Sequence, residues 1–176
     1  MNQKKLAIFA SGSGTNAENI IRFFESDNKI KVGLVLSNKK DAYVQTRAEK
    51  LNIPSVYFTR EDFYENGRVL KILKENDIDF IVLAGFLWLV PQSLIDAYPD
   101  RIINIHPALL PKYGGKGMYG NKVHETVFNN KEKESGITIH YVNESYDEGN
   151  IIYQAKCSIN ENDTPDNIAG KVHELE

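Results

Sequence analysis

A chain of 176 residues is long enough for one globular domain that buries roughly 70% of its unfolded surface, so its core needs neither a disulfide nor a structural metal. The formal net charge is -3 and the basic residues are scattered, which argues against nucleic acid as a partner. The single Cys157 excludes an internal disulfide, the N-terminal apolar run is too short for a signal peptide, and no run approaches the ~20 residues that span a bilayer. We therefore expect a cytoplasmic protein that does not enter a membrane.

Apolar runs alternate with helical patterns along the first hundred residues, as in repeated βαβ units. The run Phe-Ile-Val-Leu-Ala at 80–84 is apolar on both faces, which is typical of a central parallel strand. The elements expected here are a strand at 5–10, a helix after residue 16, a strand at 31–36, a helix at 44–51, a strand at 56–58, one long helix at 62–76 in spite of Gly67, and a strand at 80–84.

The second part of the chain continues with a helix at 91–98, with Pro91 in its first turn, and a strand that Pro107 ends. We then expect a glycine-rich loop at 113–120, a helix at 122–128, strands at 136–142 and 151–159, and a last helix with Thr164 at its N-cap. The sequence therefore predicts an α/β fold in one domain, 1–176, with a doubly wound, mostly parallel, Rossmann-like sheet whose final strand pair is an antiparallel edge. The last helix has only begun at Glu176, so we expect the natural chain to continue.

A glycine loop, Gly12-Ser13-Gly14-Thr15-Asn16-Ala17, lies between the first strand and the first helix and fits the dinucleotide fingerprint. That fingerprint also needs an acidic residue after the second strand, where this chain has Ser37-Asn38, so a nicotinamide cofactor is disfavoured. Free N-H groups at a helix N-terminus bind phosphate well, and we favour a phosphate site over a plain tight turn.

Asn104 and His106 stand two residues apart at the end of an apolar strand, so both side chains point to one face. An amide and an imidazole on one face can hold a carbonyl group and move a proton. This pair is the best candidate for a catalytic centre.

Asp147 lies in the segment Ser145-Tyr146-Asp147-Glu148-Gly149, which composition alone explains as a turn. A functional interpretation is that its carboxylate reaches His106 and raises the pKa of the imidazole above about 6.5, which would make His106 a general acid. Glu144 and Glu148 compete for that role, and the residues alone do not separate the three.

The other histidines give weaker signals. His124 is interpreted as structural, and His140 alternates with apolar residues in a strand, as a packed or supporting residue would. His173 lies in a helical pattern among polar neighbours. No pair of His or Cys has the spacing of metal ligands, so we expect no metal site.

With these motifs in place, the chain resembles the folate-dependent formyltransferase family, and within it the glycinamide ribonucleotide formyltransferases. The resemblance covers nearly the whole chain: SGSGTN at Ser11, VLAGF at Val82, NIHPALLPKY at Asn104, and Asp147-Glu148-Gly149. NIHP followed by LLP is shared by the wider family, whereas the SGSGTN loop points to this group.

The resemblance implies transfer of the formyl group of 10-formyltetrahydrofolate to the amine of glycinamide ribonucleotide, in purine (IMP) biosynthesis. It makes Asn104, His106 and Asp147 the catalytic set: Asn104 and a protonated His106 stabilise the oxygen of the tetrahedral intermediate, and Asp147 orients and charges His106. Folate is then a co-substrate, and no metal or further cofactor is implied.

The resemblance also implies two binding sets. The ribonucleotide would be bound by Gly14, Thr15, Asn16, His173 and Glu176. The folate would be bound by Arg60, Leu87, Trp88, Leu89, Val90, Asn104, Asn143, Glu144 and Asp147. For Leu87–Val90, simple core packing is an almost equal alternative.

One departure and two rival functions remain. The run Gly114-Gly115-Lys116-Gly117-Met118-Tyr119 replaces the Pro-Gly and further histidine common in the family, so loop contacts are not transferred. The chain could instead be a formyltransferase acting on methionyl-tRNA, for which a further basic domain is expected, or on an amino sugar nucleotide. It could also be a non-catalytic nucleotide-binding module. The sequence leaves the oligomeric state open.

Overall fold

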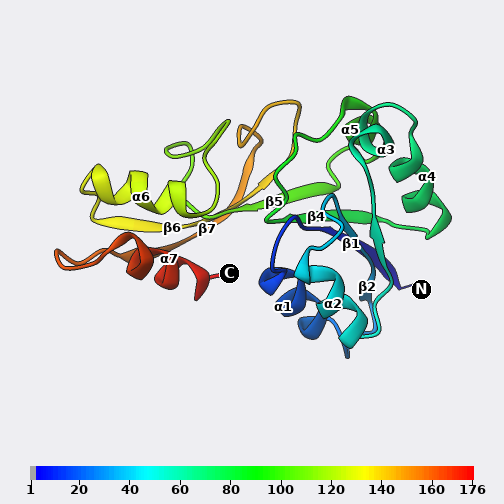
Figure 1. Ribbon diagram of the computed structural model, residues 1–176, viewed down its shortest axis with the longest axis horizontal. Coiled ribbons are helices and arrows are strands. Elements are labelled where there is room, and N and C mark those ends of the chain that lie inside the picture. Colours follow the sequence, from blue (N-terminus) through cyan, green and yellow to red (C-terminus); the bar gives the residue numbers. More distant parts are fainter. Residues whose placement is uncertain (1–2) are drawn as a thin grey trace. The chain divides into compact units, whose positions relative to one another are not determined.

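The computed structural model describes residues 3–176, which form two compact units that meet in sequence at Ile102 and Ile103. Helices and strands alternate through the first unit except at α3 and α4, which follow one another directly (Figure 1). Its elements are β1 (Lys4–Phe9), α1 (Thr15–Phe23), β2 (Ile30–Ser37), α2 (Tyr43–Lys50), β3 (Ser55–Tyr57), α3 (Arg60–Tyr64), α4 (Arg68–Glu75), β4 (Phe80–Ala84) and α5 (Gln92–Ala97).

The strands of the first unit lie in the order β3-β2-β1-β4, and each neighbouring pair is parallel. Figure 1 shows α1 and α2 on one face of these strands and α3, α4 and α5 on the other. Ile8, Leu34 and Ile81 are fully buried, as expected for strands that helices cover on both faces. The predicted α/β class and the doubly wound arrangement are confirmed here, and β4 has the predicted bounds.

The single helix predicted at 62–76 is wrong, because the chain forms α3 and α4 with a break between them. Gly67 has φ +69°, a left-handed conformation that cannot continue a helix, and it is the N-cap of α4. Asp62 stabilises the break. It accepts hydrogen bonds from the Thr59 N-H, Asn66 and Arg68, and the first of these bonds is the largest cause that lowers the pKa of Asp62 to about 2. The predicted start of the next helix also shifts, since Pro91 is the N-cap of α5 and not its first residue.

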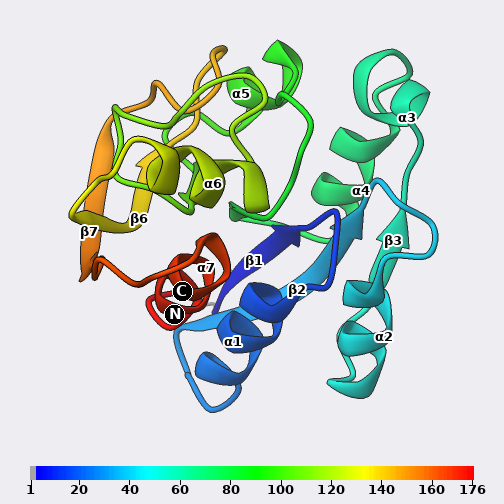
Figure 2. The same cartoon turned by 60° about the vertical axis from the view of Figure 1, so that its left-hand side comes forward.

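The second unit contains β5 (Ile102–His106), which begins at the unit boundary, α6 (Asn121–Asn129), β6 (Glu134–Tyr141), β7 (Ile151–Ser158) and α7 (Pro165–His173). Figure 2 shows β6 and β7 side by side. Both β5–β6 and β6–β7 are antiparallel, so antiparallel pairing begins one strand earlier than predicted. The predicted cap of the last helix is confirmed, because the Thr164 side chain accepts from the Asn167 N-H and Pro165 is the first residue of α7.

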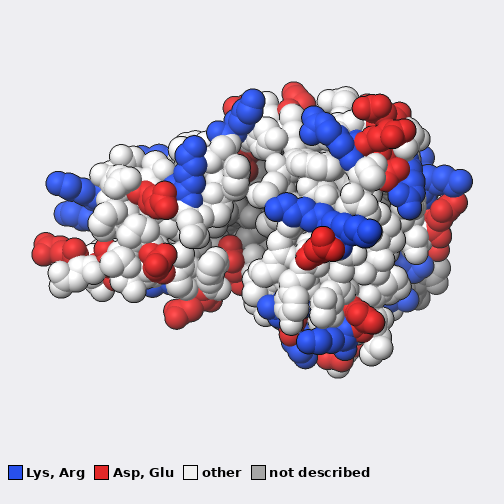
Figure 3. All heavy atoms as spheres, in the orientation of Figure 1, with Lys and Arg blue, Asp and Glu red and all other residues white. Residues whose placement is uncertain are grey.

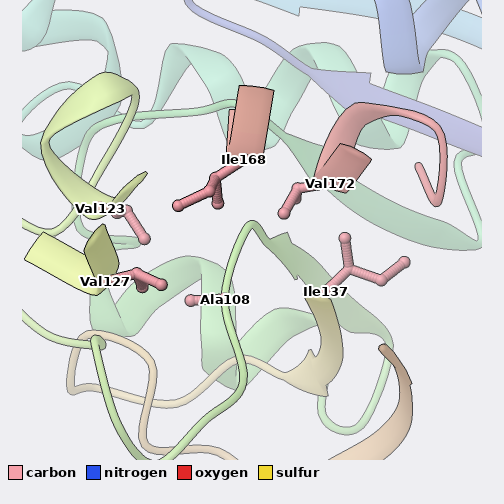
Figure 4. Packing of buried hydrophobic residues seen from close by; sticks show 6 residues of the cluster. All are labelled: Ala108, Val123, Val127, Ile137, Ile168 and Val172. Atoms are coloured by element: carbon pink, nitrogen blue, oxygen red, sulfur yellow. The ribbon is translucent and has the colours of Figure 1, made fainter. Parts of the chain in front are cut away.

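The core of the second unit lies where α6, α7 and β6 meet. Figure 4 shows aliphatic side chains from these elements, together with Ala108 from the loop after β5, pointing toward one another. The cluster consists of Ala108, Val123, Val127, Ile137, Ile168 and Val172. It fixes both helices relative to β6, which carries His140.

Charged side chains of both signs are mixed over the face of the molecule that Figure 3 shows. No helix among residues 3–176 has the length and the apolar character that crossing a membrane requires.

His124 is expected to make folding sensitive to acid. Its ring is 2% exposed, its Nδ1 has no hydrogen-bond partner among the described residues, and burial, followed by the charges of His173 and His106, lowers its pKa to about 4. Because an unfolded histidine titrates near 6.5, this stability is complete above pH 6.5 and is lost as the pH falls toward 4, by up to about 3 kcal/mol.

Urea unfolding at pH 7.5, 6 and 5 measures this loss. The variant His124→Leu should reduce it, whereas His173→Gln, which changes an exposed ring, should keep most of it. Equal acid sensitivity in His124→Leu and the parent protein would contradict the assignment.

Candidate active site

Asn104 and His106 lie at the carboxyl end of β5, on the same side of the strand, as their spacing predicts. In the antiparallel pair β5–β6, Asn104 stands opposite His140 and His106 stands opposite Thr138. His106 is only 3% exposed. The strand therefore delivers an amide and an almost fully buried imidazole to one place.

Asp147 joins this pair from the turn between β6 and β7. Its Oδ2 lies 3.5 Å from His106 Nδ1, and its Oδ1 accepts from Asn104 Nδ2 at 3.3 Å. The side chain is 11% exposed, whereas Glu144 and Glu148 are exposed and form no ion pair among the described residues. Of the three carboxylates that the sequence left open, Asp147 is the one beside His106.

The prediction that Asp147 raises the pKa of His106 is wrong in its net direction. Burial lowers the pKa of His106 below its ordinary value, and this effect exceeds the opposing effects of the Asp147 charge and of the Tyr113 carbonyl. His106 Nε2 lies 2.8 Å from that carbonyl, which can only accept, so Nε2 carries a proton. His106 is therefore a neutral Nε2-H donor at pH 7.

Asp147 is ionised at the same pH. Burial acts to raise the pKa of Asp147, but the contacts with His140 and His106 and the Gly115 N-H together lower it below the ordinary value. The site thus holds one buried carboxylate next to a neutral imidazole. A proton that reaches His106 would form an imidazolium beside this negative charge.

His140 belongs to the same cluster, although the sequence suggested only a packed or supporting residue. Its Nδ1 donates to the Tyr141 carbonyl at 2.8 Å, which leaves Nε2 to accept from Asn104 Nδ2 at 3.0 Å. Asn104 Nδ2 therefore has two acceptors, His140 and Asp147. The alternation of His140 with apolar residues was the sequence signal for this inward position.

Two backbone contacts of the cluster were missed. The Tyr113 carbonyl accepts from His106, and the Gly115 N-H donates to Asp147 Oδ2 at 2.9 Å. Gly149 was also missed as a structural requirement of the turn, because a Cβ at this position would lie 1.7 Å from the Tyr141 carbonyl oxygen. The double glycine at 114–115 and the glycine after Asp147 were the available signals.

The remaining predicted residues of the second unit lie around the β6–β7 turn and at the end of α7. Asn143 Oδ1 accepts from the Ser145 N-H at 3.0 Å, inside the turn that carries Asp147. His173 Nε2 and Glu176 Oε2 are 4.0 Å apart, and the His173 side chain is exposed. These two residues are together, as a shared site would require.

The first unit holds the other predicted residues. Gly14 is the N-cap of α1, and among residues 3–176 no side chain forms a capping hydrogen bond at the start of that helix. The Leu87 N-H donates to Ser11 Oγ at 3.1 Å, which joins the segment 87–90 to the strand end before the glycine loop. Leu87, Trp88 and Leu89 are only half-buried, and Val90 is buried, so core packing explains Val90 better than the other three.

Metal ligands do not gather in the part of the chain that the structure describes, since no group of three His, Cys, Asp or Glu there could hold an ion. The chemistry open to the second unit is that of an amide donor, an imidazole and a carboxylate. Such a set can bind a carbonyl oxygen and move a proton.

Known proteins have sequences similar to this chain. The formyl transferase family matches residues 4–176. A chloroplastic phosphoribosylglycinamide formyltransferase of Arabidopsis thaliana is 42% identical over 97% of this chain and 60% of its own length. The phosphoribosylglycinamide formyltransferase of Bacillus subtilis (strain 168) is 38% identical over 98% of this chain and 89% of its own.

A solved structure extends the likeness to three dimensions. The crystal structure of phosphoribosylglycinamide formyltransferase from Bacillus halodurans superposes with a TM-score of 0.87 at 39% identity, over 98% of this chain and 89% of that one. The present chain spans only 60% of the length of the Arabidopsis relative. On sequence and on structure, this chain belongs to the formyl transferase family.

Proposed function

We propose that the protein transfers the formyl group of 10-formyltetrahydrofolate to the amine of glycinamide ribonucleotide, with Asn104, His106 and Asp147 as its catalytic residues. The observation that carries the proposal is the buried cluster in which Asp147 contacts both other residues, in a member of the formyl transferase family. The similar proteins of Arabidopsis and Bacillus carry the name phosphoribosylglycinamide formyltransferase, which supports this acceptor over others.

The chemistry needs an oxyanion site and a proton carrier. The amine attacks the formyl carbon, and the carbonyl oxygen gains negative charge. Asn104 and the Nε2-H of His106 would stabilise that charge by exchanging a present bond, that of Asn104 to Asp147 or His140 and that of His106 to the Tyr113 carbonyl, for a bond to the oxyanion. The attacking amine must lose a proton, and N10 of the departing tetrahydrofolate must gain one. Because His106 is neutral in the free protein, it can accept the proton of the amine and later deliver a proton to N10 of the folate. Asp147 stabilises the imidazolium that exists between these two transfers.

Two binding sets complete the proposal. Gly14, Thr15 and Asn16 would bind the phosphate of the ribonucleotide, with His173 and Glu176 near its amine. The folate would contact the segment 87–90, Arg60, and the Asn143, Glu144 and Asp147 turn. The same proposal includes small-molecule substrates, a cytoplasmic location and no further cofactor.

The test is turnover with competing acceptors. Purified protein is mixed with 10-formyltetrahydrofolate and, in parallel, with glycinamide ribonucleotide, an amino sugar nucleotide or methionyl-tRNA, and tetrahydrofolate release is followed by absorbance. We expect tetrahydrofolate release only in the mixture whose acceptor is glycinamide ribonucleotide. Release with another acceptor would reassign the substrate, and no release with any acceptor would favour a non-catalytic nucleotide-binding module.

The pH dependence of His106 is expected to report its contact with Asp147. In the free protein its pKa lies below 6.5, so the neutral form that accepts a proton increases with pH and kcat/KM rises through a limb centred below pH 6.5. Asp147→Asn removes the charge that raises this pKa and should move the limb of the residual activity to lower pH. A limb of the pH profile that arises from titration of the substrate amine would lie at the same pH in Asp147→Asn and in the parent protein.

NMR titration of the His106 ring, assigned with His106→Gln, measures the same pKa without turnover. An unchanged or higher midpoint in Asp147→Asn would show that Asp147 does not stabilise the imidazolium.

A further inference from the structure

Tyr113 combines an unfavourable backbone conformation with a carbonyl group that binds His106. Its φ is +58°, in the left-handed region that a residue with a bulky side chain rarely adopts. Its carbonyl oxygen lies 2.8 Å from His106 Nε2. A residue keeps such a conformation only where the surrounding contacts hold it. The position of this carbonyl therefore depends on what holds Tyr113.

The Tyr113 side chain is held at its hydroxyl and at its ring. The hydroxyl donates to Glu132 Oε1 at 2.7 Å and accepts from Asn130 Nδ2 at 3.1 Å, and the ring packs against the aliphatic cluster of the second unit. Burial and the bond to Glu132 raise the pKa of the Tyr113 hydroxyl, and the same bond lowers the pKa of Glu132. A protonated phenol therefore donates to an ionised carboxylate, which is stronger than a bond between two neutral groups.

The neutral His106 ring has one proton for two neighbouring acceptors. Nε2 faces the Tyr113 carbonyl at 2.8 Å, and Nδ1 faces Asp147 Oδ2 at 3.5 Å. A proton on Nδ1 would be attracted by the carboxylate, but it would leave the Nε2 lone pair against the carbonyl oxygen, and two acceptors at that distance repel each other. The carbonyl therefore favours Nε2-H while Tyr113 stays in place. If Tyr113 moves away, the charge of Asp147 favours Nδ1-H.

We propose that Tyr113, held by Glu132, is a positioning residue that keeps the proton of the neutral His106 ring on Nε2. This inference rests on the proposed function, in which Nε2-H exchanges its bond to the Tyr113 carbonyl for a bond to the oxyanion. A ring with its proton on Nδ1 presents a lone pair to the oxyanion in place of a donor. Glu132 lies in the turn between α6 and β6, and it acts on formyl transfer through Tyr113.

The first measurement is the tautomer of the His106 ring. Nitrogen NMR of the labelled ring, at about pH 7.5 where the ring is neutral, separates a protonated from an unprotonated nitrogen, and His106→Gln assigns the signals. The parent protein should show Nε2-H. Tyr113→Phe and Glu132→Ala each remove the bond between the two side chains. Each should shift the ratio of tautomers toward Nδ1-H by at least about tenfold, the effect of losing one hydrogen bond to a charged group.

Turnover is the second measurement. Loss of one oxyanion donor costs ~100-fold or more in kcat, and a partial change of tautomer costs less. We expect kcat to fall about tenfold in Tyr113→Phe and in Glu132→Ala, while the KM values of both substrates stay within about twofold of the parental values. A parental tautomer or a parental kcat in a folded Tyr113→Phe protein would overturn the proposal.

Two further variants test whether Glu132 acts through Tyr113. Glu132→Gln keeps an acceptor for the Tyr113 hydroxyl and should restore Nε2-H and most of kcat. The double variant Tyr113→Phe/Glu132→Ala should lose no more activity than either single variant, because both remove the same bond. Additive losses, or a Glu132→Gln protein that behaves like Glu132→Ala, would contradict this order of action.

Lys112→Gln is the matched control. Lys112 Nζ bonds to the same Glu132 oxygen at 3.0 Å and is exposed, but its removal leaves the bond from the Tyr113 hydroxyl intact. Tautomer and kcat should therefore equal those of the parent protein. A loss as large as that of Glu132→Ala would show that the Lys112–Glu132 ion pair acts on the site, and not the hydroxyl of Tyr113.

The NMR measurement needs no substrate, so this proposal and the proposed function fail separately. If the parent protein has no turnover but Tyr113→Phe moves the proton toward Nδ1, the proposed function is wrong and the role of Tyr113 stands. If turnover is normal and the tautomer is the same in Tyr113→Phe and the parent protein, the role of Tyr113 is wrong and the proposed function stands.

Discussion

The variants His106→Ala and Asp147→Ala are each expected to lower kcat for formyl transfer by at least ~100-fold, the low end of general acid–base contributions. His106→Ala removes the proton carrier and also the ring N-H whose bond to the Tyr113 carbonyl a bond to the developing oxyanion would replace. Asp147→Ala removes the only described carboxylate beside His106 and leaves Asn104 Nδ2 and the Gly115 N-H without this acceptor.

The matched control is Glu148→Ala, which removes an exposed carboxylate one residue away and should keep the parental rate. Stopped-flow measurement of tetrahydrofolate release gives the rates, and thermal unfolding checks that each variant is folded. A folded Asp147→Ala protein with the parental rate would remove Asp147 from the mechanism.

The second large effect concerns stability. Gly136→Ala is expected to destabilise the protein by about 3 kcal/mol or more, because its Cβ would lie 1.9 Å from the backbone oxygen of Ala155 and 3.0 Å from a Leu109 methyl group. Gly136 is in β6 and Ala155 in β7, so the two strands would have to move apart. These strands flank the turn that carries Asp147, and activity should fall with stability.

Gly170→Ala provides the comparison. Gly170 lies in α7, where an added Cβ meets nothing within 4 Å, so alanine should stabilise the helix by about 1 kcal/mol. Urea unfolding of the two variants tests both the expected loss and the expected gain in the free energy of unfolding. Similar free energies of unfolding for Gly136→Ala and the parent protein would mean that β6 and β7 tolerate a wider separation than the structure shows.

Most strands and helices follow from local sequence. The alternation of apolar runs and helical patterns predicted the strands, because the period of burial is a property of neighbouring residues. The long helix at 62–76 failed for a local reason as well: the apolar positions of α3 and α4 continue one period, and only the left-handed conformation of Gly67 separates them. A glycine inside a helical pattern does not reveal from sequence whether it adopts that conformation.

Sequence by itself determined that Asn104 and His106 share one face at the end of a strand, since strand geometry fixes the direction of every second side chain. Tertiary structure decided which carboxylate joins them. Glu144, Asp147 and Glu148 are equivalent in composition, and the β6–β7 turn, with Gly149 close to the Tyr141 carbonyl, directs Asp147 inward. The pKa of His106 was likewise decided by packing, because it depends on how much water the surrounding elements exclude from the ring. The sequence predicted a raised pKa from the charge of Asp147 alone, but the burial of the ring has the larger effect and lowers the pKa.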